Sequence, residues 1–439
     1  MPRSMRWPTS FLNTVIPPPV DFALLIVNRG KNHIAVTGMG GCSAAGGTVA
    51  EILASLEKGS VHCRPVPENI FRTSLSFPAF AFAHAIPSLR SRRLLDQSGI
   101  AWTPERLNRT LLLTLEALAE ALEDAGLEPE KLRSTKVGIA LGTTVGCTFH
   151  DEQYYISWRD GKKPDPDPVF QYLESNLAAF LQTILGVIGP VSVVTNACAS
   201  GTDAIGIARG WLEDGTCDIA FAGGADALSR IAYYGFASLM LLSEKPCSPF
   251  DRGRAGLNLG EGAALLVMEK RQQADRRNAR PHGWVRGYGA ASDCYHPTAP
   301  HPDGRGLQSA LRQAMADAGI SPRTISYINA HGTGTSANDN AEMNALAALG
   351  FSECPVVSTK GITGHMLGAA GAMEAILTIL TLKQKQTRGT VSCREPDPCL
   401  ARPPLAESQE VRLPGSIGIS QSLAFGGTNS ALVLEAATP

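Results

Sequence analysis

The chain has 439 residues, of which 44 % are hydrophobic and 18 % are charged, and its 39 basic and 40 acidic side chains nearly cancel. This composition is typical of a well-packed globular protein and argues against a disordered or nucleic-acid-binding chain. No apolar run reaches the roughly 18 residues that a membrane-spanning helix requires, so we expect no membrane insertion. The ten cysteines are irregularly spaced without a CxxC pair. That spacing argues against a disulfide framework or a zinc site and favours a reducing cytoplasm.

Residues 1–32 contain Arg3 and Arg6 but no continuous apolar run, and prolines at 17–19 interrupt them. They make a poor secretory signal. We expect an N-terminal extension that packs on the body, or a start codon assigned upstream of the true one.

The folded body is expected to begin near His33, where HIAVTG has the pattern of a strand running into a glycine-rich turn. Ser43 stands where a dinucleotide-binding fingerprint needs its third glycine, so that fingerprint is absent. Apolar spacing predicts helices at 49–58, 104–125, 176–185, 201–213 and 235–240, and strands at 136–141, 192–195, 219–222 and 263–269.

After residues 284–290 the alternation restarts. We expect strands at 326–329, 356–358, 416–420 and 431–435, and helices at 306–318, 340–348 and 367–382. Such alternation predicts a parallel sheet with crossover helices. The pieces VVTNACASGTDAIGIA and VVSTKGITGHMLGAAGAMEA share one plan of strand, turn and Gly/Ala-rich helix. This similarity suggests two related halves, at 33–290 and 291–439.

A single cysteine, Cys198, follows a β-branched run in VSVVTNACASGTDAIG and opens a helix of small residues. The run predicts a buried strand. The free N–H groups and the macrodipole at a helix start would stabilise a thiolate and make Cys198 a nucleophile. A buried structural cysteine is the ordinary alternative, and Cys198 alone does not exclude it.

Three distant segments carry further chemistry. His331 follows a predicted strand in NAHGTGTSANDNAE, and Lys360, His365 and Glu374 lie in STKGITGHMLGAAGAMEA. Phe425 precedes two glycines in SQSLAFGGTN. Taken singly, each has an ordinary explanation: a satisfied histidine, a solvated lysine, a simple turn.

Taken together and in this order, these segments closely resemble the β-ketoacyl-acyl-carrier-protein synthases, the elongating condensing enzymes of the thiolase-like superfamily. The resemblance extends from about His33 to Glu435 and includes AGGADAL, SPFDRGRAGLNLGEGAALLVME and SDCYHPTAP. It implies an α/β thiolase-like fold in which two similar α/β halves form a five-layered α-β-α-β-α core. It also implies an acyltransferase that condenses an acyl thioester with malonyl-acyl-carrier protein, with loss of CO₂, to a 3-oxoacyl-acyl-carrier protein.

By this resemblance Cys198 is the acyl-carrying nucleophile. His331 and His365 would donate imidazole N–H groups to the thioester oxygen where charge develops. Lys360 would order the site. The residues that match supporting positions are Glu374, as the buried partner of Lys360, and Phe425, as an aromatic gate whose backbone N–H, with that of Cys198, forms an oxyanion hole.

The resemblance also implies binding residues. Thr333 and Thr335 match positions that bind the phosphopantetheine arm, and Thr298 lies in a loop that would do the same. The basic run Arg90, Arg92 and Arg93 lies where relatives contact the acidic carrier protein, although it has the pattern of a solvated helix face as well. No cofactor is expected beyond phosphopantetheine on the carrier protein.

Two departures bear on substrate choice. Leu423 and Ala424 replace Phe and Gly of the usual FGFGGTN, and Ala424 would restrict the swing of the gate turn. Asn196 stands where many relatives have Thr. These departures favour a specialised lipid, polyene or polyketide pathway over housekeeping fatty-acid elongation. We expect a homodimer, or a heterodimer with a related subunit, with the strand at 218–223 placed where relatives pair.

The residues argue against four rival interpretations. A thiolase would need a second cysteine near SQSLAFGGTN, and an initiating synthase would lack the second histidine of GITGHMLG. A pocket-shaping partner subunit with little activity of its own would lack the nucleophile, which Cys198 supplies. A metal enzyme is disfavoured, since His331 and His365 have no carboxylate or cysteine at ligand spacing.

Overall fold

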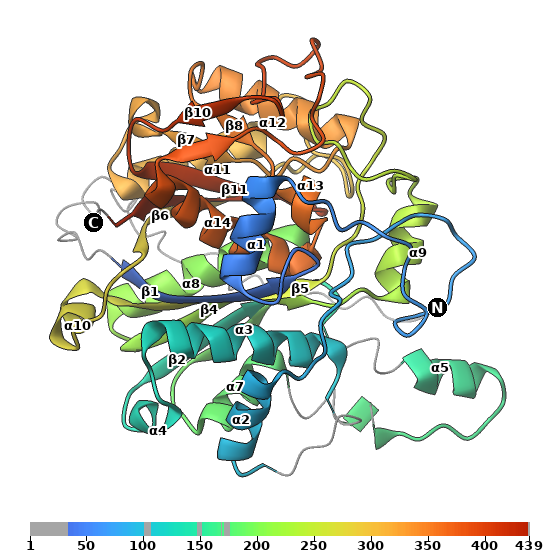
Figure 1. The fold of residues 1–439 in the computed structure, drawn as a ribbon, viewed down its shortest axis with the longest axis vertical. Helices are drawn as coiled ribbons and strands as arrows, with labels where there is room; N and C mark the ends of the chain where they lie inside the picture. Colours follow the sequence, from blue (N-terminus) through green and yellow to red (C-terminus); the bar gives the residue numbers. More distant parts are fainter. Residues whose placement is uncertain (1–33, 101–106, 147–151, 168, 171–175, 438–439) are drawn as a thin grey trace, which may run out of the picture. The chain divides into compact units, whose positions relative to one another are not determined.

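The structure is a computed structural model that describes residues 34–100, 107–146, 152–167, 169–170 and 176–437. All of them belong to one compact unit, His33–Pro439, coloured along the chain in Figure 1. Within the described residues, no helix is long and apolar enough to cross a membrane. The predicted extension at 1–32 lies outside the described residues.

The first half of the unit contains the five strands β1 to β5 with their helices. Its elements are β1 (Ile34–Ser43), α1 (Val49–Lys58), α2 (Leu89–Gln97), α3 (Arg109–Ala125), α4 (Pro129–Leu132), β2 (Val137–Gly142), α5 (Glu152–Arg159), α7 (Leu177–Leu185), β3 (Val191–Val194), η3 (Ala197–Ala199), α8 (Ser200–Asp214), β4 (Ile219–Asp226), α9 (Arg230–Ser238), β5 (Gly262–Lys270) and α10 (Arg271–Arg276).

The second half repeats this plan and adds a small strand pair, β9–β10. Its elements are β6 (Gly283–Ser292), α11 (Arg305–Ala318), η4 (Pro322–Thr324), β7 (Tyr327–Asn329), α12 (Ser336–Ala348), β8 (Val356–Val357), α13 (Lys360–Thr363), η5 (Leu367–Ala369), α14 (Ala370–Gln384), β9 (Gln386–Arg388), β10 (Glu410–Arg412), β11 (Ile417–Leu423) and β12 (Thr428–Ala436).

The strand order shows that the two halves are alike. The main sheet runs β3-β2-β4-β5-β1 and continues β6-β12-β11-β7-β8, joined by a short antiparallel β1–β6 contact. When each half is numbered from its own first strand, both have the order 3-2-4-5-1. The first three strands of each order pair in parallel, and the last two join antiparallel. This duplication confirms the fold expected from the resemblance.

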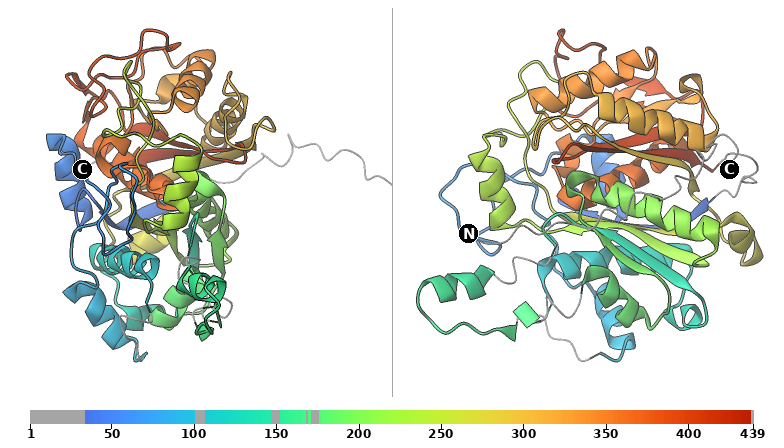
Figure 2. Two further views of the ribbon diagram at one scale, coloured as in Figure 1. Left: turned by 90° about the vertical axis from the view of Figure 1, so that its right-hand side faces the viewer. Right: turned by 180° about the vertical axis from the view of Figure 1, so that it is seen from behind.

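The helices complete five layers, visible in Figures 1 and 2. Helices α8 and α14 pack against each other between the two sets of strands, α3 covers β1 and β5, and α11 covers β6 and β12 on the opposite outer face. The central helices approach closely because they are rich in small residues. A Cβ on Gly201 of α8 would lie 2.6 Å from the carbonyl oxygen of Gly368. The turns that open α8 and α14 therefore meet in the middle of the molecule.

N-capping side chains account for several helix starts. Thr48, Asn108 and Asn176 each accept a backbone N–H at the start of a helix, as N-capping side chains do. Helix α3 consequently begins at Arg109, whereas 104 was expected, and residues 101–106 lie outside the described part. The helix expected at 235–240 is Arg230–Ser238, with Ser229 as its cap.

Three expectations about the sheet are wrong. The sheet is mixed: the connection between β4 and β5 contains α9 but returns the chain so that β5 runs antiparallel to β4, and β1 also joins β5 antiparallel. Strand β3 is not buried: it forms the edge of the sheet, and Val191 is 38 % exposed. The segment at 218–223, expected to pair across a dimer, falls in β4, which has β2 on one side and β5 on the other and so has no free edge.

Candidate active site

Cys198 lies in the short turn η3 that leads into α8, and its side chain is only 4 % exposed. The preceding Ala197 has a φ of 45°, a left-handed conformation that is strained for alanine. Hydrogen bonds hold the turn. Ser200 Oγ accepts the N–H of Asn196 at 2.8 Å and donates to the carbonyl of Ala197 at 2.6 Å. The chain thus turns sharply and directs Cys198 into the centre of the molecule.

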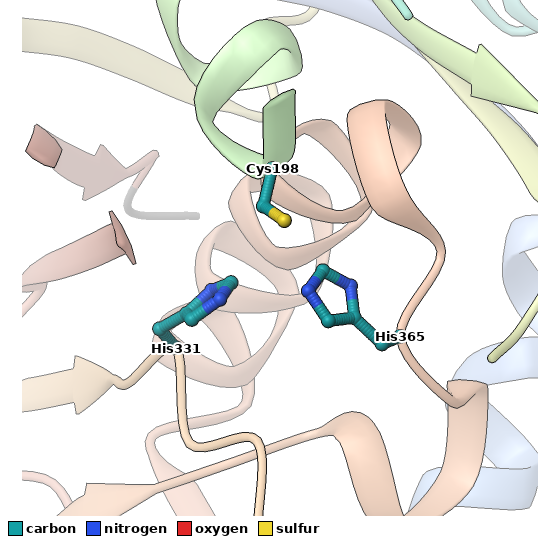
Figure 3. Close-up of side chains that lie close together, drawn as sticks. All are labelled: Cys198, His331 and His365. Atoms are coloured by element: carbon teal, nitrogen blue, oxygen red, sulfur yellow. The ribbon is translucent and has the colours of Figure 1, made fainter. Parts of the chain in front are cut away.

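Two histidines from the second half face this cysteine (Figure 3). His331 follows β7, and His365 lies between α13 and η5. The rings meet edge to face with their centroids 5.1 Å apart. The sulfur of Cys198 and one nitrogen of each ring lie within 4.8 Å of one another. The fold therefore gathers three residues that are far apart in the sequence.

Hydrogen bonds define the proton positions on both rings. Nδ1 of His365 accepts the backbone N–H of Leu367 at 3.2 Å, so the proton of a neutral ring lies on Nε2. Nδ1 of His331 lies 3.2 Å from Nζ of Lys360, and an ammonium group only donates. Both imidazoles thus have Nδ1 occupied and an Nε2–H left for the space beside Cys198.

Lys360 is fully buried and pairs with Glu374, which lies on α14. It also donates to the backbone carbonyl of His331 at 2.6 Å. Burial raises the pKa of Glu374 to about 7, with the charge of Lys360 acting in the opposite direction. The ion pair with Glu374 holds the ammonium group of Lys360 against His331, so a positive charge lies beside the imidazoles.

Both histidines are neutral in this setting. Burial first, and then the nearby charge of Lys360, lowers the pKa of His331 and of His365 well below the usual value. Neutral rings are N–H donors toward a developing oxyanion and are not cations that would need a counter-charge.

The expectation of a resting thiolate is wrong. Burial raises the pKa of Cys198 to about 12, although Lys360 and the backbone N–H of Phe425 oppose this effect. Desolvation of an enclosed sulfur outweighs the stabilisation that the turn and the lysine supply. The free pocket therefore holds Cys198 as a thiol, and its negative charge has to develop during reaction.

The Cys198–His331–His365 cluster also has the composition of a metal site. A metal ion here would need a free lone pair on Nε2 of each histidine. In a neutral ring whose Nδ1 accepts a hydrogen bond, Nε2 carries the proton and has no lone pair to offer. The adjacent ammonium of Lys360 would also repel a cation. The residues present do not fit a bound metal.

Buried carboxylates that were not singled out in the sequence hold the loops of the site. Glu342 accepts the backbone N–H groups of His331 and Gly332, both at 2.6 Å, and the side chains of Asn338 and Gln421. The polar residues of α12 that point inward could have indicated this role. They are Asn338, Asp339 and Glu342.

Asp226 has a corresponding role in the first half. At the end of β4, it accepts the N–H of Gly368 at 2.7 Å, the N–H of Thr144 at 2.7 Å and the hydroxyl of Thr143 at 2.8 Å. It therefore joins the turn that opens α14 to the loop after β2.

Phe425 lies in the turn between β11 and β12, and its backbone N–H is directed at the sulfur of Cys198. Its ring stacks on Phe236 of α9, with centroids 5.3 Å apart and planes at 21°. Phe236 also meets His365 edge to face at 6.5 Å. The sequence offered no indication of Phe236, because an aromatic residue on a helix is usually part of the core.

The three threonines expected to bind phosphopantetheine do not lie together. Thr333 is buried, and its hydroxyl lies 2.8 Å from that of Thr335. Thr298 lies in the loop after β6, where its backbone N–H donates to His296 at 3.1 Å. No contact in the described residues joins Thr298 to the other two.

The basic run lies on α2. Arg90 pairs with Glu123 of α3 at 2.7 Å, and Nε of Arg92 donates to the carbonyl of Pro87 at 3.1 Å. Arg92 and Arg93 are exposed, whereas the charge of Arg90 is partly neutralised by its carboxylate partner.

Comparison with known proteins agrees with this geometry. Residues 31–274 match the family model of the β-ketoacyl synthase N-terminal domain, and residues 282–394 match that of its C-terminal domain. A 3-oxoacyl-[acyl-carrier-protein] synthase 2 from Synechocystis sp. is 32 % identical over 423 residues, which cover 93 % of this chain and 99 % of that one.

Solved structures agree as well. The ishigamide ketosynthase/chain length factor has 31 % identity and a TM-score of 0.81, with 93 % of this chain and 100 % of that chain covered. A ketosynthase in complex with its chain length factor from Xenorhabdus doucetiae has 29 % identity and a TM-score of 0.76, with 93 % and 99 % covered. The chain belongs to the β-ketoacyl synthase family. It is accordingly an acyltransferase of the condensing type.

Proposed function

We propose that this protein catalyses the 3-oxoacyl-acyl-carrier-protein synthase reaction, with Cys198 as nucleophile and His331 and His365 as oxyanion donors. The observation that carries the proposal is the convergence of one sulfur and two Nε2–H groups in a buried space. Glu374 holds Lys360, and Lys360 in turn orients His331.

In the first half-reaction the sulfur of Cys198 attacks the carbonyl carbon of an acyl-carrier-protein thioester. The bond to the phosphopantetheine sulfur breaks, and that sulfur takes up the thiol proton. The backbone N–H groups of Phe425 and Cys198 stabilise the tetrahedral oxyanion. The charge of Lys360 assists the cysteine sulfur as its proton leaves.

In the second half-reaction a malonyl thioester enters. Its carboxylate leaves as CO₂, and the Nε2–H groups of His331 and His365 stabilise the enolate formed on the thioester oxygen. The enolate carbon attacks the acyl carbon on Cys198. The C–S bond then breaks, the Cys198 thiolate that leaves takes up a proton from water, and the 3-oxoacyl thioester remains on the carrier protein.

We propose the acyl-carrier protein as the partner that delivers both substrates, with no cofactor besides its phosphopantetheine arm. Thr333 and Thr335 support binding of the arm, since their paired hydroxyls lie on the loop that carries His331. Thr298, in the loop after β6, is a further candidate for binding the arm. The exposed guanidinium groups of Arg92 and Arg93, together with Arg90, are the proposed docking surface for the acidic carrier protein.

We also propose assembly with a second subunit, either a copy of this chain or a related one. The exposed edge of β3 supports assembly with a second subunit. Val191 lies on this edge and Ile188, which is 78 % exposed, lies just before it, so apolar side chains are left uncovered there. We propose two halves close to the expected 33–290 and 291–439, but with the boundary between α10 and β6, since β6 is the first strand of the second half. The proposed compartment is the cytoplasm, since every cysteine in the described part of the chain is free.

The test is to incubate the protein with acyl-carrier proteins of different chain length and saturation, add malonyl-carrier protein, and follow all species by intact mass. We expect an acyl adduct that maps to Cys198 and a 3-oxoacyl product, both absent from Cys198→Ala. Lack of an adduct on the wild-type chain would contradict the proposal and favour the pocket-shaping subunit. The chain length that yields most product distinguishes fatty-acid elongation from a specialised pathway.

A further inference from the structure

The hairpin of β11 and β12, which carries Phe425 in its turn, is bonded to the helix that follows Cys198. Ser422 and Ser430 face each other across the hairpin. The hydroxyl of Ser422 lies 2.9 Å from that of Thr202 on α8, and the hydroxyl of Ser430 donates to Asp203. Both strands of the hairpin are thus anchored to α8, but below the turn itself.

Asn196 supplies a contact at the turn. Its Nδ2 donates to Asp203 at 2.6 Å, and its Oδ1 accepts the hydroxyl of Thr428 at 3.0 Å. Its backbone is engaged as well, because its carbonyl accepts the N–H of Ala199 at 3.1 Å. The amide of Asn196 therefore bridges the turn of Cys198 and the turn of Phe425.

Thr428 in turn closes the tight loop that aims the N–H of Phe425. Its carbonyl accepts the N–H of Ala424 at 2.7 Å, and Gly427 donates back to the carbonyl of Ala424 at 3.1 Å. The N–H between these bonds, that of Phe425, is directed at the sulfur of Cys198. A displacement of Thr428 would therefore move this donor relative to the sulfur.

We propose that Asn196 is a positioning residue that aligns the Phe425 N–H with the sulfur of Cys198 through Thr428. The residue type suits this role, since the two ends of one amide donate to Asp203 and accept from Thr428. A threonine at this position would offer a single oxygen, one bond closer to the backbone. The inference rests on the proposed function for its kinetic consequence, but the alignment itself is a property of the free protein.

Thr428→Val removes the hydrogen bond between Thr428 and Asn196 at nearly constant side-chain volume. Thr428→Ser keeps the hydroxyl and serves as the conservative rescue. Asn196→Leu removes the other partner of the same hydrogen bond. The exposed Thr216→Val is the matched control. Each full-length protein is measured for thermal unfolding, acyl transfer to Cys198, decarboxylation of malonyl-carrier protein, and alkylation of Cys198 by iodoacetamide between pH 7 and 10, followed by peptide mass.

We expect Thr428→Val to slow acyl transfer about tenfold, because a misaligned oxyanion donor is lost in part, while decarboxylation stays within about twofold. Alkylation should be about threefold slower at each pH, since loss of a hydrogen bond to the thiolate raises the pKa of Cys198 by about half a unit and the whole window lies below that pKa. Thr428→Ser should restore both measurements. Asn196→Leu combined with Thr428→Val should be no slower than Asn196→Leu alone, as expected if the Thr428 hydroxyl acts only through its bond to Asn196.

Unchanged alkylation and acyl transfer in Thr428→Val would overturn the proposal. So would an equal fall of both half-reactions together with a lower unfolding temperature, since that outcome indicates a purely structural role. If the wild-type chain takes up no acyl group but Thr428→Val still slows the alkylation of Cys198 as expected, the positioning role stands and the proposed function fails.

Discussion

Nζ of Lys360 lies 3.2 Å from Nδ1 of His331 and donates at 2.6 Å to the backbone carbonyl of the same residue. One buried cation therefore sets both the position of His331 and the nitrogen that carries its proton. Its own charge is balanced by Glu374 on the central helix α14. Stability and catalysis consequently depend on the same ion pair, but they can be separated experimentally.

Lys360→Met should lower the free energy of unfolding by about 3 kcal/mol, because it leaves Glu374 as an unpaired buried carboxylate. Adding Glu374→Leu should recover most of that loss, since an apolar pair of similar volume replaces the ion pair. Condensation should stay low in both variants, as neither fixes the Nε2–H of His331. Chemical denaturation and product mass check the two effects. Recovery of condensation in the double variant would show that Lys360 acts only on stability.

His365→Leu tests the donor role of the second histidine. Leucine keeps much of the side-chain volume but offers neither an N–H to the substrate oxygen nor an acceptor to the N–H of Leu367. We expect condensation to fall about 100-fold, in keeping with the loss of one oxyanion donor, while acylation of Cys198 changes little. Rapid-quench mass spectrometry measures both. An equal loss of acylation would argue that His365 serves the first half-reaction instead.

The lowered pKa of His365 predicts acid sensitivity. Below about pH 6.5 His365 binds a proton in the unfolded chain but stays neutral in the folded chain. The free energy of unfolding therefore falls as the pH falls. Between pH 7.5 and 5.5 this residue should lower the free energy of unfolding by about 1.4 kcal/mol, and His365→Asn should abolish that share of the pH dependence.

Urea unfolding at the two pH values measures this difference, with His84→Asn as the control at an exposed histidine. Buried carboxyls with raised pKa, such as Glu374 and Glu342, act in the opposite direction. They are present in both proteins and cancel in the comparison. An identical pH dependence in wild type and His365→Asn would mean that the pKa of His365 is the same in the folded and the unfolded chain, and so is not lowered by burial.

Glu342→Gln tests the anchor of the His331 loop. All four groups that contact Glu342 are donors, so the new NH₂ group would face one of them. We expect a loss of about 2 kcal/mol in the free energy of unfolding and slower condensation. Glu353→Gln, at an exposed glutamate, should alter neither. Wild-type stability in Glu342→Gln would mean that the carboxyl is already protonated in the folded chain.

Much of the site follows from short segments read locally. Cys198, His331, Lys360, His365 and Phe425 each sit in a strand–turn–helix or strand–turn–strand piece whose pattern is visible within some twenty residues. Helix starts such as Asn108 are local in the same way, because a cap acts on an N–H three residues later. The order of these pieces was sufficient to indicate the family and the layered fold.

Other features depend on contacts between residues far apart in the chain, and only the tertiary structure decided them. The thiol of Cys198 was expected to ionise readily from its helix start, but enclosure by the second half raises its pKa. Strand β3 has the residues of a buried strand, yet its place at the end of the sheet leaves it exposed. Asn196 meets Thr428 across 232 positions, and Gln421 meets Glu342 across 79. Burial and long-range hydrogen bonding are properties of the packed chain, so no local pattern of residues specifies them.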